Sequence, residues 1–307
     1  MIISVLVPVY NEEKNISLFY NRISTILKKI SDKYDYEIIF SDNCSSDDTI
    51  FEIKKIYAVD KKIRIISLSR NFGRNASQLA LLNIAKGNLL FMIDVDCEDQ
   101  PELLLDFVKY YEQGYDIVYG IRNRINESLV KFFFAKLFYR VTKLLSENVI
   151  IKDMGEFVLF TDSIKKEIIK TNTSFPFIRA ELSYAGFKRK GIDYKRDKRK
   201  YGKTNYSFIK LLFYAGSGFL SSTTFLLRFN SILGFLLILT NSIYLISNKM
   251  DIDSIVKNII FLIVLNVNLI FLMLISISIY LARTYSNSLK RSVYIIDYNR
   301  SVNINEK

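Results

Sequence analysis

The feature that most constrains the fold is an alternation of strand and helix signals over residues 1–120. Short β-branched runs predict strands, and segments with apolar residues three or four positions apart predict amphipathic helices. The predicted strands are residues 2–7, 36–40, 63–68, 89–93 and 116–119, and the predicted helices are residues 13–30, 47–56, 76–85 and 101–113. Strands that alternate with helices of this length indicate an α/β domain with a mostly parallel, doubly wound sheet.

Two carboxylates, Asp94 and Asp96, follow the apolar run 89–93 with one residue between them. Open α/β sheets bind ligands at the carboxyl edge of their strands, where this pair would lie. Hard oxygen ligands suit Mg²⁺ or Mn²⁺, and either ion can hold a diphosphate. Because any loop can carry an Asp-x-Asp sequence, the pair by itself leaves a metal site and an ordinary loop both open.

The composition excludes several kinds of chemistry. The chain has no histidine in 307 residues, which rules out a histidine general base, a Ser-His-Asp triad and histidine-ligated zinc. Its two cysteines, Cys44 and Cys97, lack the spacing of a zinc site. The formal net charge of +12 suits nucleic acid, anionic lipid or an anionic substrate as a partner, with solubility alone as the simpler explanation.

Two uncharged apolar stretches, residues 229–246 and 259–281, are long enough to cross a membrane as helices. Basic residues flank the pair at both ends: Arg228, Arg283, Lys290 and Arg291. This bias predicts that both ends lie in the cytoplasm and that the connector 247–258 lies outside. Three asparagines inside the stretches are expected to hydrogen-bond between helices or subunits: Asn241, Asn266 and Asn268. The alternative is a buried helical hairpin of a soluble protein.

Residues 127–146 combine aromatic side chains with lysine and arginine at helical spacing. This pattern fits either a core-facing helix or a basic amphipathic helix on an anionic membrane. A second such stretch at 208–225, just before the apolar segments, favours the membrane. The predicted organisation is an α/β domain (1–206), an amphipathic juxtamembrane segment (207–228), a transmembrane hairpin (229–281) and a cytoplasmic C-terminal tail (282–307).

The loops that would converge at the carboxyl edge of the sheet carry an ordered set of motifs. They are VPVYNEE (7–13), DNCSSDDT (42–49), LSRNFGRNAS (68–77), FMIDVDCEDQPE (91–102), YGIR (119–122), FYR (138–140), MGEF (154–157) and RKYGKTNY (199–206). Through these motifs the chain resembles family 2 glycosyltransferases of the polyisoprenyl-phosphate type, such as dolichyl-phosphate mannose synthase and the bacterial bactoprenol glucosyltransferases. Each motif is weak alone, but their order and spacing extend over nearly the whole chain.

The resemblance implies a GT-A fold and the inverting transfer of a sugar from a nucleotide-sugar, with UDP favoured, to a polyprenyl phosphate, with undecaprenyl phosphate favoured. It implies Mg²⁺ or Mn²⁺ as cofactor, membrane lipid as a partner, and a homo-oligomer that by resemblance is a tetramer. Nucleic acid is disfavoured as a partner, because the basic residues accompany apolar helices rather than a polar groove and two membrane spans are predicted. The lipid-linked sugar would serve cell-envelope glycan modification. The implied location is the bacterial inner membrane, with several membrane passes and a cytoplasmic catalytic domain.

The same resemblance assigns site residues position by position. The implied donor-binding residues are Pro8, Tyr10, Glu12, Asp42, Asn43, Asp94, Arg199 and Lys203. The implied metal ligands are Asp94, Asp96 and Glu98. The implied catalytic residues are Asp96, Glu156, Arg122 and Lys131, the last two facing the acceptor phosphate. Such an acceptor needs no general base, because a phosphate monoester with a second pKa of about 6 is largely ionised near neutrality.

Some positions depart from the family pattern. Glu156 stands where relatives carry Asp, Val158 where many carry Arg, and Asn205 where many carry Lys. These departures leave open a catalytically impaired membrane scaffold or partner subunit. A processive polysaccharide synthase is disfavoured, because the chain has no tryptophan for the Gln-x-x-Arg-Trp motif of those enzymes. For Arg74 a solvated side chain is favoured over a direct contact with the donor. The charged run 195–200, which contains Arg199, is typical of a solvated loop, although in this family such a loop often closes over the donor.

Overall fold

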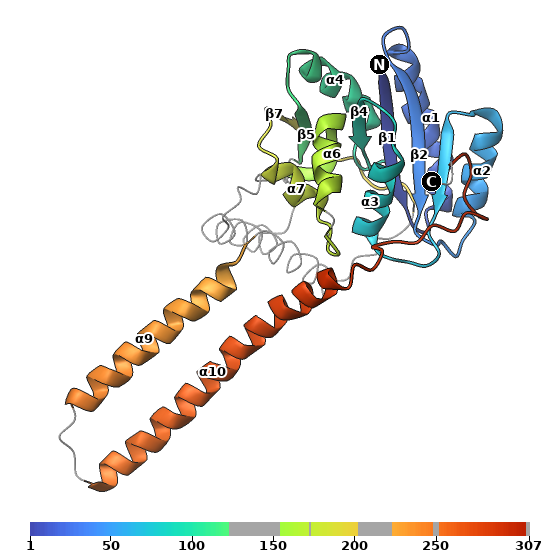
Figure 1. Cartoon of the computed structure of the whole chain (residues 1–307). Coiled ribbons are helices and arrows are strands. Elements are labelled where there is room, and N and C mark those ends of the chain that lie inside the picture. Colours follow the sequence, from blue (N-terminus) through green and yellow to red (C-terminus); the bar gives the residue numbers. More distant parts are fainter. Residues whose placement is uncertain (123–153, 172, 202–222, 248–251, 305–307) are drawn as a thin grey trace.

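The structure, a computed structural model, describes residues 1–122, 154–171, 173–201, 223–247 and 252–304. A seven-stranded sheet with helices on both faces forms the domain, and a helical hairpin extends from it (Figure 1). The strands are β1 (Ile2–Val9), β2 (Asp35–Asp42), β3 (Ile63–Ser67), β4 (Leu89–Met92), β5 (Ile117–Arg122), β6 (Met154–Thr161) and β7 (Arg189–Tyr194). The helices are α1 (Glu13–Lys29), α2 (Thr49–Val59), α3 (Arg74–Ile84), the 3₁₀ turn η1 (Pro101–Leu103), α4 (Leu104–Glu112), α6 (Asp162–Lys170), α7 (Ile178–Tyr184), α9 (Phe225–Ser247) and α10 (Ile252–Ser288).

The strand order is β3-β2-β1-β4-β6-β5-β7. Strand β6 runs antiparallel to β4 and β5, and the other neighbouring pairs are parallel. The predicted mostly parallel sheet is therefore confirmed, with boundaries within a few residues of those expected. The fifth strand is longer than predicted and ends at Arg122, which places that side chain at the carboxyl edge.

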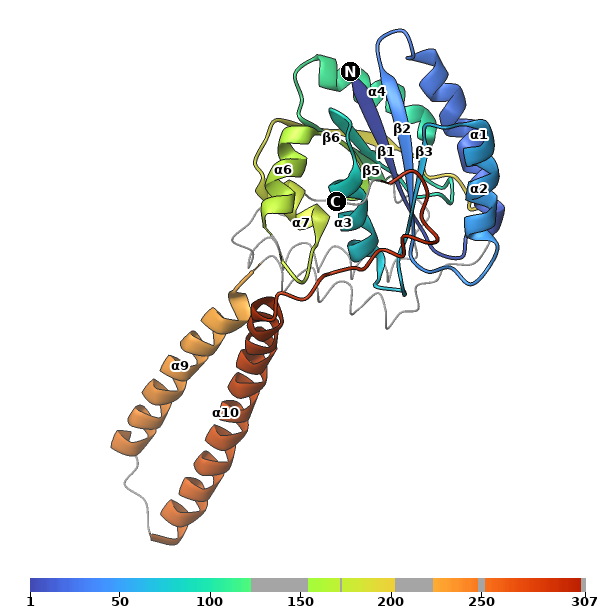
Figure 2. The same ribbon diagram turned by 45° about the vertical axis from the view of Figure 1, so that its right-hand side comes forward.

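Apolar side chains alternate between the two faces of the sheet and meet a different set of helices on each. On one face, fully buried Ile16, Phe19 and Ile23 of α1 pack with side chains of α2 and α4. On the other face, α3, α6 and α7 cover the sheet (Figure 2). The buried apolar residues of α1 are three and four positions apart, which lets an amphipathic helix bury one side. The periodicity in the sequence therefore positions the helical layer against the sheet.

Gly120 allows β5, β6 and β7 to pack closely against each other. A Cβ at this position would lie 2.6 Å from Cε1 of Tyr194 and 2.7 Å from Cδ1 of Phe157. We expect Gly120→Ala to destabilise the domain by about 1–3 kcal/mol, because overpacking forces well-placed rings to move. Thermal unfolding of the purified chain measures this effect. Gly234→Ala is the matched control, since its Cβ would meet Met273 Cε at 3.8 Å; equal unfolding temperatures for the two variants would contradict the prediction.

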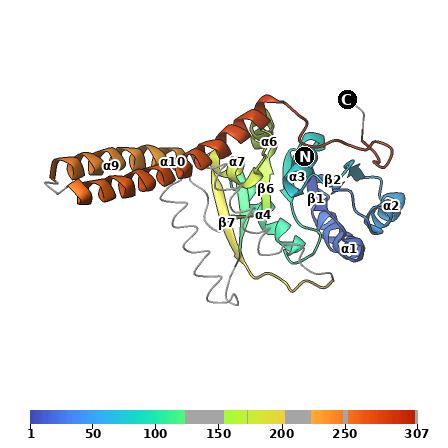
Figure 3. The ribbon, with the colours of Figure 1, turned by 90° about the horizontal axis from the view of Figure 1, so that it is seen from below.

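Helices α9 and α10 form a hairpin whose apolar surface the domain leaves uncovered (Figures 1 and 3). Leu227–Tyr244 and Val256–Ser288 are long and apolar enough to cross a membrane, and neither segment is buried inside the structure. This exposure argues against the core hairpin of a soluble protein. The Asn241 side-chain amide donates to Asn266 Oδ1 at 3.2 Å, so the predicted hydrogen bond between helices is confirmed for this pair, whereas Asn268 bonds within its own helix to Val264 O.

The predicted C-terminal tail, residues 282–307, begins within α10 and then packs on the domain. Residues 282–288 continue α10, and residues 289–304, which we call the C-terminal strap, return to the domain and run along β3. The strap pairs with this edge strand through antiparallel bridges from Val302 to Ile65 and from Ile296 to Leu68. It thereby uses backbone groups that an exposed sheet edge would leave unpaired.

Candidate active site

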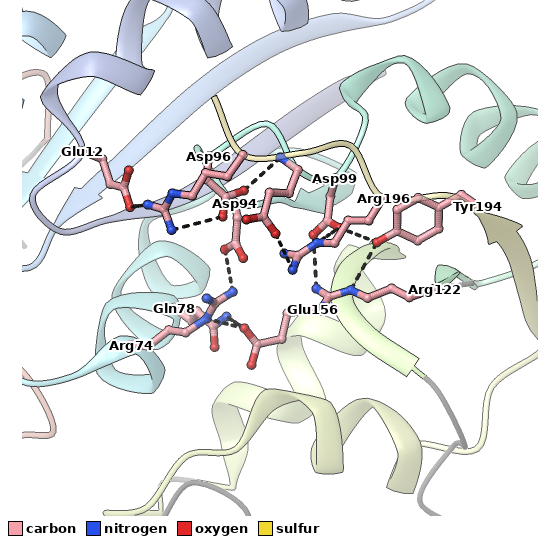
Figure 4. Close-up of polar contacts among 12 residues, drawn as sticks. Glu12, Arg74, Gln78, Asp94, Asp96, Asp99, Arg122, Glu156, Tyr194 and Arg196 are labelled. Carbon is pink, nitrogen blue, oxygen red and sulfur yellow. Dashed lines mark hydrogen bonds and ion pairs between the residues drawn. The ribbon is translucent and has the colours of Figure 1, made fainter. Parts of the chain in front are cut away.

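A cavity of about 540 Å³ lies at the carboxyl edge of β1, β2, β4 and β5, next to the start of the antiparallel β6. The predicted site residues that line it are Pro8, Tyr10, Glu12, Asn43, Asp94, Asp96, Glu98, Arg122, Glu156 and Arg199. Residues that the sequence had not assigned to the site line it as well: Asn71, Gly73, Arg74, Ser77, Arg179 and Arg196. The cavity therefore combines carboxylates with several arginines, and many of these arginines form ion pairs with the carboxylates (Figure 4).

Asp94 and Asp96 follow β4 and carry side chains that are 17% and 13% exposed. Arg74 Nη2 lies 2.5 Å from Asp94 Oδ1, and Arg199 Nη1 lies 3.8 Å from Asp96 Oδ2. Burial raises the pKa of Asp96 to about 6, with repulsion from Asp94 as the next cause and the Glu98 N–H bond opposing it. A buried carboxylate whose charge is disfavoured by a neighbouring carboxylate is suited to binding a cation.

Arginines neutralise the acidic groups around the cavity. Arg74 bridges Asp94 and Glu156, and Arg199 bridges Glu12 and Asp96. Both arginines therefore already lie on the groups that a metal or a donor would approach. A diphosphate is itself a strong acceptor of arginine hydrogen bonds. The side chains of Arg74 and Arg199 are therefore suited to exchange a carboxylate partner for a phosphate when such a ligand enters.

Arg122 is held at the end of β5 by a buried acidic group. Its Nη2 donates to Asp99 Oδ2 at 3.3 Å and its Nε to Tyr194 Oη at 3.4 Å, while the Tyr194 hydroxyl donates to Asp99 (Figure 4). The Asp99 side chain is 2% exposed. Burial raises its pKa, but the charges of Arg122 and Arg196 outweigh burial and hold that pKa below its usual value. Asp99 therefore remains a carboxylate that orients two arginines.

Glu98, the predicted third metal ligand, is paired with an arginine in the structure. Its Oε2 lies 2.6 Å from Arg196 Nη1, and Arg196 Nε also donates to Asp99 Oδ1 at 3.0 Å. Within the part of the chain that the structure describes, no group of three histidine, cysteine, aspartate or glutamate side chains is arranged to hold a metal ion. A cation at Asp94 and Asp96 would thus depend on further oxygens from a ligand, as Mg²⁺ commonly does with substrate phosphates.

The side of the cavity that is predicted to hold the nucleoside is built by the loops after β1 and β2. Pro8, Tyr10 and Asn43 line the wall, and the Asn43 amide donates to Asn71 Oδ1 at 2.9 Å. Asp42 lies beneath this wall rather than on it, because its side chain is fully buried and accepts the Ser45 N–H at 3.0 Å. Its contact with a ligand would therefore be indirect in this conformation.

Glu156 lies near the start of β6 and faces α3. Its Oε2 accepts a hydrogen bond from the Gln78 amide at 2.8 Å and pairs with Arg74 (Figure 4). The carboxylate therefore helps to fix Arg74 against Asp94. Lys131 and Lys203, the two remaining predicted site residues, lie outside the described part of the chain.

Arg74 and Arg196 line the cavity although the sequence analysis favoured a solvated position for both. Arg74 begins α3, and Arg196 belongs to the run 195–200, whose charge density suggested a solvated loop. In the structure Asp197 N donates to Glu98 O at 2.8 Å, which fixes part of this run beside the carboxylates. The available clue was that this basic run continues directly into the family motif at 199–206.

Comparison with known proteins shows what the chain is similar to. The model of the glycosyl transferase family 2 matches residues 4–171. The uncharacterized glycosyltransferase YkcC of Bacillus subtilis is 31% identical over 95% of this chain and 92% of its own length. The prophage bactoprenol glucosyl transferase homolog of Escherichia coli is 30% identical over 96% of this chain and 98% of its own length.

Among solved structures, mannosyl-3-phosphoglycerate synthase from Rubrobacter xylanophilus overlaps with a TM-score of 0.49 at 14% identity, over 72% of each chain. A similarity of this size says nothing about substrate. The family match covers six of the seven strands and the carboxylate pair, and the two sequence relatives align with nearly the whole chain. The chain therefore belongs to glycosyl transferase family 2 and is a glycosyltransferase with a GT-A fold.

Proposed function

We propose that this enzyme transfers a sugar, with inversion, from a UDP-sugar to a polyprenyl phosphate such as undecaprenyl phosphate at the cytoplasmic face of a bacterial membrane. The observation that carries this proposal is a cavity in which a carboxylate pair and several arginines meet, in a domain joined to a hairpin suited to a membrane. Bactoprenol in the names of relatives supports the lipid acceptor. The product would supply lipid-linked sugar for envelope glycan.

In this proposal the donor lies along the carboxyl edge of the sheet. Pro8, Tyr10 and Asn43 hold the nucleoside, and Glu12 fixes Arg199 close to the diphosphate. Asp94 and Asp96 would hold Mg²⁺ or Mn²⁺ together with the diphosphate oxygens. A bound divalent ion supplies positive charge to the leaving diphosphate. The pair fits such an ion because burial and repulsion from Asp94 already disfavour the negative charge of Asp96.

The acceptor approaches from the side of Arg122, with Lys131 as a second predicted contact. One acceptor phosphate oxygen forms a bond to the anomeric carbon, and the bond from that carbon to the donor diphosphate breaks. The diphosphate leaves with the bonding electrons, and attack from the opposite face inverts the anomeric centre. No proton has to be removed from the acceptor, which agrees with a chain that has no histidine.

The hairpin would keep this site at the membrane surface. Arg228 and the basic residues after α10 favour the cytoplasmic side for both ends of the hairpin. Ser174 N–H donates to Asn287 Oδ1 at 2.9 Å, so the loop before α7 contacts the end of α10. This contact would position the domain close to a lipid whose phosphate must reach Arg122.

A donor panel tests the proposed function. The full-length chain in lipid nanodiscs is incubated with undecaprenyl phosphate, Mn²⁺ or Mg²⁺, and separate UDP-, GDP- and TDP-sugars, and the lipids are analysed by mass spectrometry. We expect a sugar-phosphate lipid with a UDP-sugar and the release of UDP. Nucleotide binding without a product from any donor would instead support the impaired scaffold that the departures at Glu156, Val158 and Asn205 left open.

Glu156 gives a prediction about metal affinity. In Glu156→Gln, Arg74 loses one of its two carboxylates and remains on Asp94, where it opposes a cation. We expect the Mn²⁺ concentration that half-saturates UDP binding to rise about fivefold, the size of a partly exposed charge interaction. Glu167→Gln on the outer face of α6 is the matched control and should have no effect. A lower Mn²⁺ requirement in Glu156→Gln would show that Arg74 does not compete with the metal.

A further inference from the structure

The C-terminal strap packs along β3 and contacts the residues at the carboxyl ends of β2 and β3. Ile65 and Val302 exchange two backbone hydrogen bonds at 3.0 and 2.9 Å, and Ser69 N donates to Ile295 O at 2.9 Å. Val302 also packs against the core. Figures 1 and 2 show the strap running from the end of α10 across the domain to β3. The strap thus connects the hairpin with the edge of the sheet.

A turn in the strap brings a cation to the carboxyl ends of β2 and β3. Asp297 N donates to Ser67 O at 2.8 Å, and the Ser301 hydroxyl accepts the Ser67 N–H at 2.9 Å. Between these two anchors, Arg300 Nη2 lies 3.9 Å from Asp42 Oδ2. The arginine side chain is 39% exposed, whereas the aspartate is fully buried. The strap therefore places a positive charge beside a buried carboxylate of the sheet.

Asp42 organises the two loops that form the nucleoside wall. It accepts the Ser45 N–H at 3.0 Å, and the Ser45 hydroxyl in turn accepts the Asn11 N–H at 2.9 Å. Asn11 follows Tyr10, and it also accepts the Ser46 N–H at 2.8 Å. The loop after β2 is thereby tied to the loop after β1, and Asp42 holds Ser45, one of the residues that make this link.

The charge of Asp42 needs support because the group is buried. Burial raises the pKa of the Asp42 carboxyl, and the groups that oppose this effect are the Ser45 hydroxyl and N–H, the positive charge of Arg300 and the Ser67 hydroxyl. Arg300 is thus the cation that faces the carboxylate. A protonated Asp42 would be a weaker acceptor for Ser45, and the link between the two loops would loosen.

We propose that Arg300 is a positioning residue of the nucleotide pocket, which acts through Asp42 on the loops that hold the nucleoside. The inference rests on the proposed function, since it takes a nucleoside diphosphate as the ligand of this cavity. The strap thereby takes part in donor binding. As a continuous chain segment it also connects the end of the membrane hairpin to the residues that support the donor pocket.

The first test is UDP binding in the presence of Mn²⁺, measured by calorimetry on the full-length protein at several pH values. We expect Arg300→Met to weaken binding about fivefold near neutral pH. The pH at which binding is half lost on acidification should also rise, because removal of a nearby cation raises the pKa of a carboxylate. Arg300→Lys should restore most of the affinity, and Arg291→Met, at an exposed arginine of the same strap, is the matched control.

A double-mutant cycle separates positioning through Asp42 from simple docking of the strap. In an Asp42→Asn background, Arg300→Met should cause little further loss, since the carboxylate through which it acts is gone. An equal loss in both backgrounds, or binding by Arg300→Met that matches the wild type at every pH, would overturn the inference alone. A wild type that binds neither UDP nor GDP would overturn the proposed function, and the nucleotide role of Arg300 with it. The pH series uses Arg300→Met by itself, so it decides the question even if Asp42→Asn fails to fold.

Discussion

Replacement of Asp94 and Asp96 together by asparagine is expected to abolish sugar transfer, with kcat/KM lowered by about a thousandfold or more. Two oxygens that would hold the metal and the leaving diphosphate lose their charge, and electrostatic stabilisation of a leaving group is among the largest contributions to catalysis. The same variant should bind UDP with an affinity that no longer responds to Mn²⁺. Steady-state transfer and metal-dependent UDP titration measure the two effects.

The fold of this variant should remain intact. Burial and repulsion from Asp94 raise the pKa of Asp96, so removal of both charges relieves this repulsion in the ligand-free protein. The ion pairs of Asp94 and Asp96 are lost as well, but Arg74 keeps Glu156 and Arg199 keeps Glu12 as a partner. The unfolding temperature is therefore expected to stay near that of the wild type. Asp106→Asn combined with Asp193→Asn removes the same charge from exposed positions and serves as the control. Substantial transfer by the Asp94/Asp96 variant, or an equal loss in the control, would contradict a metal-diphosphate role for the pair.

Arg122→Met is expected to lower kcat/KM for the lipid phosphate by about a hundredfold, while UDP affinity changes by less than about twofold. Asp99 and Tyr194 hold the guanidinium at the end of β5, where it faces the cavity. A phosphate gains charge-assisted hydrogen bonds from such a preoriented arginine. Transfer assays at varied polyprenyl phosphate concentration, alongside UDP calorimetry, measure the two affinities separately.

The controls for Arg122 come from the same region. Arg122→Lys should recover part of the activity, since it keeps the charge but loses the planar fork. Arg189→Met removes a partly buried arginine of neighbouring β7, whose side chain donates to Ser183 O and is not among those lining the cavity. If Arg122→Met weakened UDP binding and left the dependence on lipid phosphate unchanged, Arg122 would serve the donor instead of the acceptor.

The parts of the fold that local pattern determines were predicted from the sequence. The strands and helices over residues 2–119 have short-range signals, such as the buried stripe of Ile16, Phe19 and Ile23 on α1. The long apolar segments of α9 and α10 were predicted from an equally local signal, the absence of charged residues. The carboxylate pair was predicted because its position depends only on where β4 ends. The family match confirms the class of enzyme that these motifs indicated.

The parts that depend on long-range pairing were not predicted. Insertion of β6 between β4 and β5, in the antiparallel direction, brings Glu156 to the cavity, and no local feature of 154–161 specifies that neighbour. The C-terminal strap reaches β3 from more than two hundred residues away in the sequence. Arg196 looked solvated because its charge is visible in the sequence, whereas its partners Glu98 and Asp99 are specified only by the fold.

In the proposed reaction the acceptor is a lipid phosphate, which attacks without a general base. A direct test compares undecaprenyl phosphate with undecaprenol, the same lipid without its phosphate, in nanodiscs that contain the wild-type protein, Mn²⁺ and the donor that the panel identifies. We expect sugar transfer and stoichiometric UDP release with the phosphate, an inverted anomeric centre in the product, and no transfer to the alcohol. Transfer to undecaprenol at a comparable rate, or a product that retains the donor's anomeric configuration, would contradict the account.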